Sequence, residues 1–185
     1  WLLIIFIIGA FFIDTSRKRL YLLIWLLLVI MCSPYDITFN KIELSVAFLM
    51  LLIGTIIFFA IESVTWYKFF VSFTLMLCYI SLLIWEKITP VWFFMPSYFL
   101  IPFLMVILIL LLVRKFYDRL SVALVGVAFG QFIYELLLIS YKLHDVIGDE
   151  IVFIHISLII LFITIMNFFQ FIFYKLTNIL ERKLT

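Results

Sequence analysis

The sequence predicts an all-helical integral membrane protein, a bundle of about seven transmembrane helices. Two observations carry this prediction. The 185 residues are 68% hydrophobic and only 13% charged, which is too apolar for a soluble domain of this length. The apolar residues also gather in runs that are separated by short polar breaks, as in successive membrane-spanning helices.

The polar breaks divide a single transmembrane domain, residues 1–185, into seven spans. The run 20–33 is short for a hydrocarbon core of ~30 Å, so the alternative count is six, with this run turning back or lying at the interface. The run 1–13 precedes its basic residues, the reverse of the order in a signal peptide, so we expect a retained span. The expected spans are 1–13, 20–33, 44–61, 69–85, 97–113, 120–141 and 151–174.

The positive charges predict the orientation of these spans. With strict alternation, ten of the 13 Lys and Arg residues fall on one side and three, Lys41, Lys87 and Lys142, on the other. Because cytoplasmic loops are rich in Lys and Arg, the N-terminus is predicted outside and the C-terminus in the cytoplasm. No basic block is present, so nucleic acid is not an expected partner.

Smaller features predict local structure. Pro90, Pro96 and Pro102 interrupt the region 86–102, which predicts a short interfacial turn or helix at 91–95 and a kink near Pro102. The tail from 175 is expected to continue the last helix near the inner surface. Cys32 and Cys78 both lie inside apolar segments and are expected to be packing residues.

The span 120–141 holds a helix-packing motif. Gly126 and Gly130 are spaced as G-x-x-x-G, which allows a second helix to approach closely. The sequence leaves open whether that helix belongs to the same chain or to a second protomer.

Polar residues in the last two spans form a candidate intramembrane cluster. Glu135 lies six residues before the outer end of its span and His155 four residues after the outer end of the next, so their depths are similar. Gln131 lies one turn from Glu135, and Asn167 marks the inner half of the last span. Two interpretations are open. Glu135 and His155 form a buried proton-handling or ligand-binding pair, or the polar residues fix helix packing by hydrogen bonds. In the second case Glu135→Gln is expected to retain stability.

The sequence contains no catalytic signature. The motifs H-E-x-x-H and G-x-S-x-G are absent, and no His, Cys and carboxylate residues have metal-ligand spacing. We therefore expect a non-enzymatic protein without a cofactor or a metal site.

Three segments resemble those of a known family. They are DTSRKRL, YISLLIWEKITPVW and FYDRLSVALVGVAFGQFIYELLLISYKLHDVIG. In these segments, and over most of its length, the chain is similar to the YphA-like membrane proteins of Bacillus and related endospore formers. The resemblance implies a multi-pass protein of a bacterial plasma membrane that is associated with sporulation. It implies no activity and assigns no functional residues.

Two functions follow as hypotheses. The first is a scaffold or regulatory protein that binds other membrane proteins, or a second copy of itself, within the lipid bilayer. The alternative is a small transporter, channel or substrate-binding membrane subunit that uses Gln131, Glu135 and His155. A sealed apolar bundle would favour the scaffold, and a polar cavity that reaches Glu135 would favour the alternative.

Overall fold

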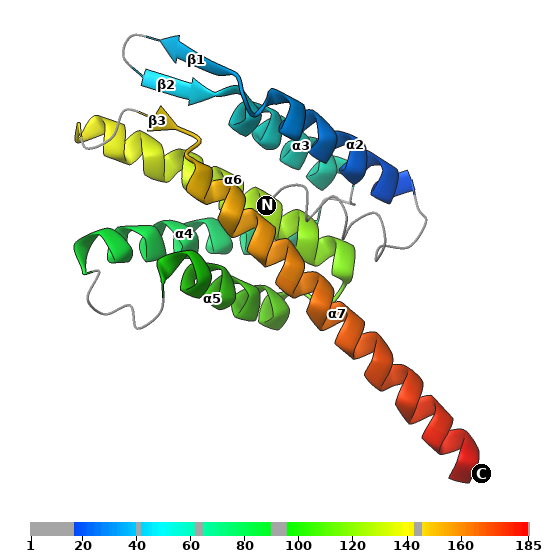
Figure 1. Cartoon of the computed structure of the whole chain (residues 1–185). Coiled ribbons are helices and arrows are strands. Elements are labelled where there is room, and N and C mark those ends of the chain that lie inside the picture. Colours follow the sequence, from blue (N-terminus) through cyan, green and yellow to red (C-terminus); the bar gives the residue numbers. More distant parts are fainter. Residues whose placement is uncertain (1–16, 40–41, 62–64, 90–95, 143–145, 185) are drawn as a thin grey trace.

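The computed structural model of the chain describes residues 17–39, 42–61, 65–89, 96–142 and 146–184 (Figure 1). The expected first span, 1–13, and the expected interfacial segment, 91–95, lie outside the described residues. Apolar runs form helices because a helix satisfies its own backbone hydrogen bonds where no water is present. The helices are α2 (Arg17–Cys32), α3 (Val46–Ile61), α4 (Trp66–Ile88), α5 (Ser97–Leu112), α6 (Phe116–Ser140) and α7 (Glu150–Leu184).

The helices divide into two length classes. Three are long and apolar enough to cross a membrane, namely α4, α6 and the segment Glu150–Gln170 of α7. The other three helices, α2, α3 and α5, are shorter in their apolar part, which spans Leu20–Cys32, Val46–Ile61 and Ser97–Leu112. The helical fold is therefore confirmed, while the count of seven spans and the orientation stay predictions. Pro102 lies inside α5, where its side chain is buried, and the kink expected there also stays a prediction.

A small sheet was not predicted. Strand β1 (Asp36–Phe39) pairs antiparallel with β2 (Ile42–Ser45), and β2 pairs in parallel with β3 (Val146–Ile147). The expected third span began at residue 44, whereas Ile42–Ser45 form β2 and the helix α3 begins at Val46. The missed signal is the alternation of apolar and polar residues in DITF and IELS, which is typical of strands.

Helix α6 lies at the centre of the bundle. It contacts α3, α4, α5, α7 and β3. In Figure 1 the pair α2 and α3 lies on one side of α6, the pair α4 and α5 lies on the other, and α7 crosses between them. The side chains of α6 are correspondingly buried over much of its length. Cys32 and Cys78 are free thiols that pack, half-buried, against the core.

The α2–α3 pair is joined by a tryptophan. The indole N–H of Trp25 donates a hydrogen bond of 3.0 Å to the carbonyl oxygen of Met50, and the ring lies where a Cβ at Gly54 would be. Glycine at position 54 therefore gives α2 its close approach to α3.

Helix α7 is much longer than the other helices. It has 35 residues, which corresponds to about 52 Å at ~1.5 Å per residue. Its C-terminal half extends away from the rest of the bundle (Figure 1). The expectation that the tail continues the last helix is confirmed as far as Leu184.

Candidate functional site

The glycine motif faces α4. A Cβ at Gly126 would lie 2.8 Å from the Cβ of Leu75, and a Cβ at Gly130 would lie 2.9 Å from Cδ1 of Tyr79. Both positions also lie close to the α4 main chain, at the carbonyl oxygens of Ser72 and Met76. The two glycines thus let α6 and α4 of the same chain approach closely, and no second protomer is needed to occupy the motif.

This close contact brings α4 alongside the polar turn of α6 that contains Glu135. The Glu135 side chain is 1% exposed, and its carboxylate accepts three hydrogen bonds. The Gln131 amide nitrogen donates to Oε1 over 2.8 Å, and the main-chain N–H groups of Gly148 and Asp149 donate over 2.9 Å and 3.4 Å, to Oε2 and Oε1. The last two donors directly precede α7, where the positive end of the helix dipole favours a negative charge.

Gly148 shapes the loop that presents these amides. Its φ is +89°, in the region that glycine adopts most readily, and Phe48 of α3 occupies the space that a Cβ would need. A side chain at position 148 would therefore both strain the backbone and push α3 away from the loop.

A second set of hydrogen bonds continues from Gln131 to α4 and α7. The Tyr79 hydroxyl lies 3.0 Å from Oε1 of Gln131 and 2.8 Å from Nδ1 of His155. The rings of Tyr79 and His155 also meet edge to face, with centroids 5.8 Å apart. Glu135, Gln131, Tyr79 and His155 thus form one continuous buried network, which we call the polar network.

The direct Glu135–His155 pair, an expectation from depth alone, is not formed. No ion pair within 4 Å joins the two side chains, and they are connected only through Gln131 and Tyr79. The carboxylate turns instead toward the loop before α7, and Tyr79 takes the place beside the imidazole. Asn167 lies about three helical turns from His155 and has no hydrogen bond to the polar network.

Tyr79 is the member that the sequence analysis missed. Tyrosine is enriched at membrane interfaces, whereas Tyr79 lies in the middle of the expected span 69–85 and is fully buried. A tyrosine hydroxyl at that depth requires a partner, which was the available signal.

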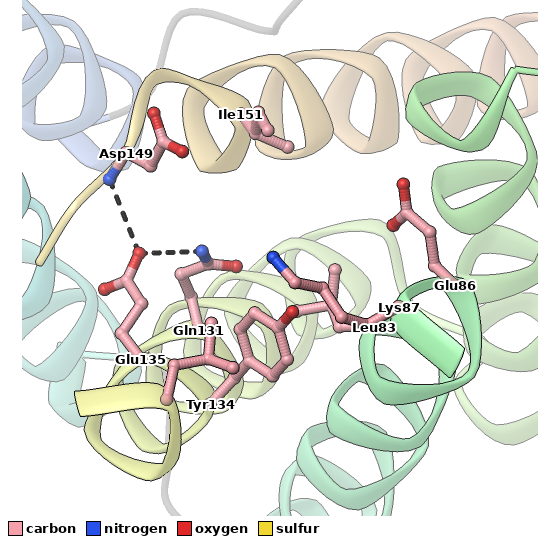
Figure 2. A pocket seen from close by; sticks show the side chains of 9 residues that line it. Leu83, Glu86, Lys87, Gln131, Tyr134, Glu135, Asp149 and Ile151 are labelled. Atoms are coloured by element: carbon pink, nitrogen blue, oxygen red, sulfur yellow. Dashed lines mark hydrogen bonds between the residues drawn. The ribbon is translucent and has the colours of Figure 1, made fainter. Parts of the chain in front are cut away.

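A pocket with a volume of about 330 Å³ lies against the polar network. Figure 2 shows its three walls: the end of α4, the polar turn of α6, and the start of α7. Lys87 extends into the pocket from α4, opposite the carboxyl group of Asp149 (Figure 2). The lining residues are Leu83, Glu86, Lys87, Gln131, Tyr134, Glu135, Leu138, Asp149 and Ile151. His155 does not line the pocket, so it communicates with it only through the polar network.

The opposite end of the bundle has charged contacts of its own. Lys68 of α4 forms an ion pair of 2.6 Å with Asp118 of α6, and both side chains are largely buried. The Arg119 guanidinium donates 2.7 Å to the carbonyl oxygen of Val113 and 3.4 Å to the side-chain oxygen of Gln170. These groups satisfy one another and fix the ends of α4, α5, α6 and α7.

Apolar helices long enough to cross a bilayer, packed around a buried polar network, define an integral membrane protein. The sequence model of the family described as YphA-like integral membrane protein matches residues 1–185, the whole chain. The chain belongs to this family, as its three characteristic segments suggested. No curated protein and no solved structure matches the chain.

Proposed function

We propose that this membrane protein binds a small polar ligand in the pocket between α4, α6 and the start of α7. The observation that carries the proposal is a pocket that has charged residues in its wall and reaches Glu135, the feature that separates ligand binding from a purely structural bundle. Its volume of about 330 Å³ lies at the lower end of the range for small-molecule sites, ~300–1,000 Å³. The pocket faces the predicted outer side of a bacterial plasma membrane.

The placement of polar groups favours a binding protein over a channel. The polar network crosses from α6 to α7, from Glu135 through Gln131 and Tyr79 to His155. At the other end of the bundle, Lys68 forms an ion pair with Asp118, and Arg119 donates a hydrogen bond to the main chain. A ligand could therefore be held at the outer side without a polar path to the inner side.

The charges around the pocket favour a zwitterion that carries both an ammonium and a carboxylate group. Lys87 supplies one positive charge, while Glu86 and Asp149 supply negative charges. The carboxylate of Glu135 also lines the pocket, but it is already engaged by its three hydrogen-bond donors. Within the described part of the chain, neither Lys87 nor Glu86 has an ion-pair partner. A ligand carboxylate would pair with Lys87, and its ammonium would pair with Glu86 or Asp149 near the Tyr134 ring.

Calorimetry in lipid nanodiscs tests the proposal. The probes are the twenty amino acids and phosphoethanolamine, followed by the decarboxylated and the deaminated form of the best binder. The zwitterion is expected to bind, and each truncated form at least about tenfold more weakly, because a charge-assisted hydrogen bond contributes about 1.5–3 kcal/mol. Lys87→Gln should abolish the advantage of the carboxylate, whereas Glu43→Gln, an exposed carboxyl group in β2 outside the pocket, should not.

The proposal fails if no probe in the panel binds. It also fails if Lys87→Gln and Glu86→Gln leave the affinity of a bound probe unchanged, since both residues line the pocket and neither has a hydrogen bond to the polar network.

A non-enzymatic scaffold or regulatory protein is the second candidate, and α7 is the observation that favours it. The helix is longer than a hydrocarbon core of ~30 Å, and its C-terminal half extends beyond the other helices (Figure 1). That half could present a binding surface to another protein on the cytoplasmic side. A scaffold needs no ligand, so the same probe panel separates the two candidates. For either one, the resemblance to proteins of endospore formers makes sporulation the expected setting.

A further inference from the structure

The polar network has a defined direction of hydrogen-bond donation. A carboxylate can only accept, so the charged Glu135 requires the Gln131 amide to present its nitrogen, as it does over 2.8 Å. The amide oxygen of Gln131 then faces α4 and accepts the O–H of Tyr79 over 3.0 Å.

The same reasoning fixes the proton on His155. The Tyr79 hydroxyl has one hydrogen, and it is donated to Gln131, so the hydroxyl oxygen must accept from the imidazole. His155 therefore carries a proton on Nδ1, which lies 2.8 Å from the hydroxyl oxygen. Its other ring nitrogen, Nε2, is buried without a hydrogen-bond partner among the described residues, so no second contact decides the tautomer.

We propose that Gln131, Tyr79 and His155 form a hydrogen-bond relay whose direction is set by the charge on Glu135. If position 135 becomes neutral and gains a donor, the Gln131 amide turns over and offers its oxygen to position 135. Its nitrogen then donates to Tyr79, and Tyr79 donates to Nδ1 of His155. The histidine proton consequently moves from Nδ1 to Nε2.

The geometry around Glu135 favours this reversal over a local rearrangement. A glutamine at position 135 can keep its oxygen at the Oε2 position, where Gly148 donates over 2.9 Å, and place its nitrogen toward Gln131. This arrangement loses only the longer bond of 3.4 Å from Asp149. The opposite placement would set two donors, the amide nitrogen and the Gly148 N–H, against each other.

The relay goes beyond ligand binding, because it requires nothing in the pocket. It connects the pocket wall on α6 with the Tyr79–His155 contact between α4 and α7. A proton on Glu135 acts as the amide does, since a protonated carboxyl group gains an O–H donor. The titratable groups that surround the relay are Asp149 before α7, Glu86 and Lys87 from α4, and Tyr134 from α6.

Nitrogen-15 NMR of histidine side chains tests the proposal directly. The sequence has two histidines, His144 and His155, so a His144→Gln background leaves one signal set. Couplings to the ring protons show which nitrogen carries hydrogen. We expect Nδ1–H in this background and Nε2–H after Glu135→Gln. Hydrogen on the same nitrogen in both proteins would overturn the proposal.

Two further variants exclude indirect effects. Glu86→Gln neutralises a pocket carboxyl group that has no bond to the polar network and should leave the proton on Nδ1. Tyr79→Phe interrupts the relay, so Glu135→Gln should no longer move the proton in that background. The parent spectrum is decisive even if Glu135→Gln does not fold, since hydrogen on Nε2 there would itself refute the assigned direction.

Discussion

At the residue scale, Glu135 belongs to the wall of the pocket and also to the join between α6 and α7. Two of its three donors are main-chain amides of the loop that leads into α7. Sequence reasoning placed Glu135 and His155 at similar depths and Gln131 one turn from Glu135, and all three lie in the polar network. The need of a buried tyrosine hydroxyl for a partner pointed to Tyr79, but depth along a helix does not say which face of a neighbouring helix turns inward, so its partners could not be named from the sequence.

The bonding of Glu135 changes the expectation for Glu135→Gln. An amide cannot accept from all three donors, and the Asp149 N–H is the one left without an acceptor, so the variant should fold but lose about 1–3 kcal/mol. Thermal unfolding in detergent measures this loss. Glu86→Gln, from the same pocket but without a bond to the polar network, is the matched control and should unfold like the parent. Equal melting temperatures for both variants would mean that the carboxylate is not needed to hold the loop before α7.

At the element scale, the apolar runs located most helix ends to within a few residues. The expected spans 69–85, 97–113 and 120–141 correspond to α4, α5 and α6. The sheet was not predicted for two reasons. Strand β3 has only two residues, Val146 and Ile147, which is too short for a recognisable pattern, and its pairing with β2 joins segments about 100 residues apart. Hydropathy also fails to show which helix lies against Gly126 and Gly130, because that depends on the tertiary arrangement.

The contact between α4 and α6 predicts the effect of enlarging Gly130. The Gly130→Leu side chain would meet Tyr79 and the α4 main chain, and such overpacking costs about 1–3 kcal/mol or more. Val125→Leu is the matched control on the same helix, because Val125 lines an apolar pocket of about 350 Å³ with room for an added methylene group. We expect the unfolding temperature in detergent to fall for Gly130→Leu and to stay near the parent value for Val125→Leu. A parent-like temperature for both would show that α6 and α4 are not in tight contact at Gly130.

At the scale of the whole molecule, the charge distribution predicts which loops are external. The loop before α6 is expected in the cytoplasm and the loop before α7 outside. The side of the membrane on which each loop lies can be measured by labelling Lys115→Cys and Glu150→Cys with a membrane-impermeant thiol reagent. Each variant is made in a background without Cys32 and Cys78. Both native side chains are exposed. In intact cells Glu150→Cys should be labelled, whereas Lys115→Cys should require permeabilised cells, and the reverse pattern would invert the orientation.

The pairing of β2 with β3 imposes a parity rule on the path of the chain through the bilayer. Because Glu43 pairs with Val146, the loop after α2 and the loop before α7 must emerge on the same side of the membrane. The four helices between them, α3 to α6, must then make an even number of crossings. If the long helices α4 and α6 both cross, α3 and α5 either both cross, in spite of their 16 residues each, or both return to the side they entered from. Whether α3 crosses the membrane therefore decides whether α5 crosses it, whichever way the protein is oriented.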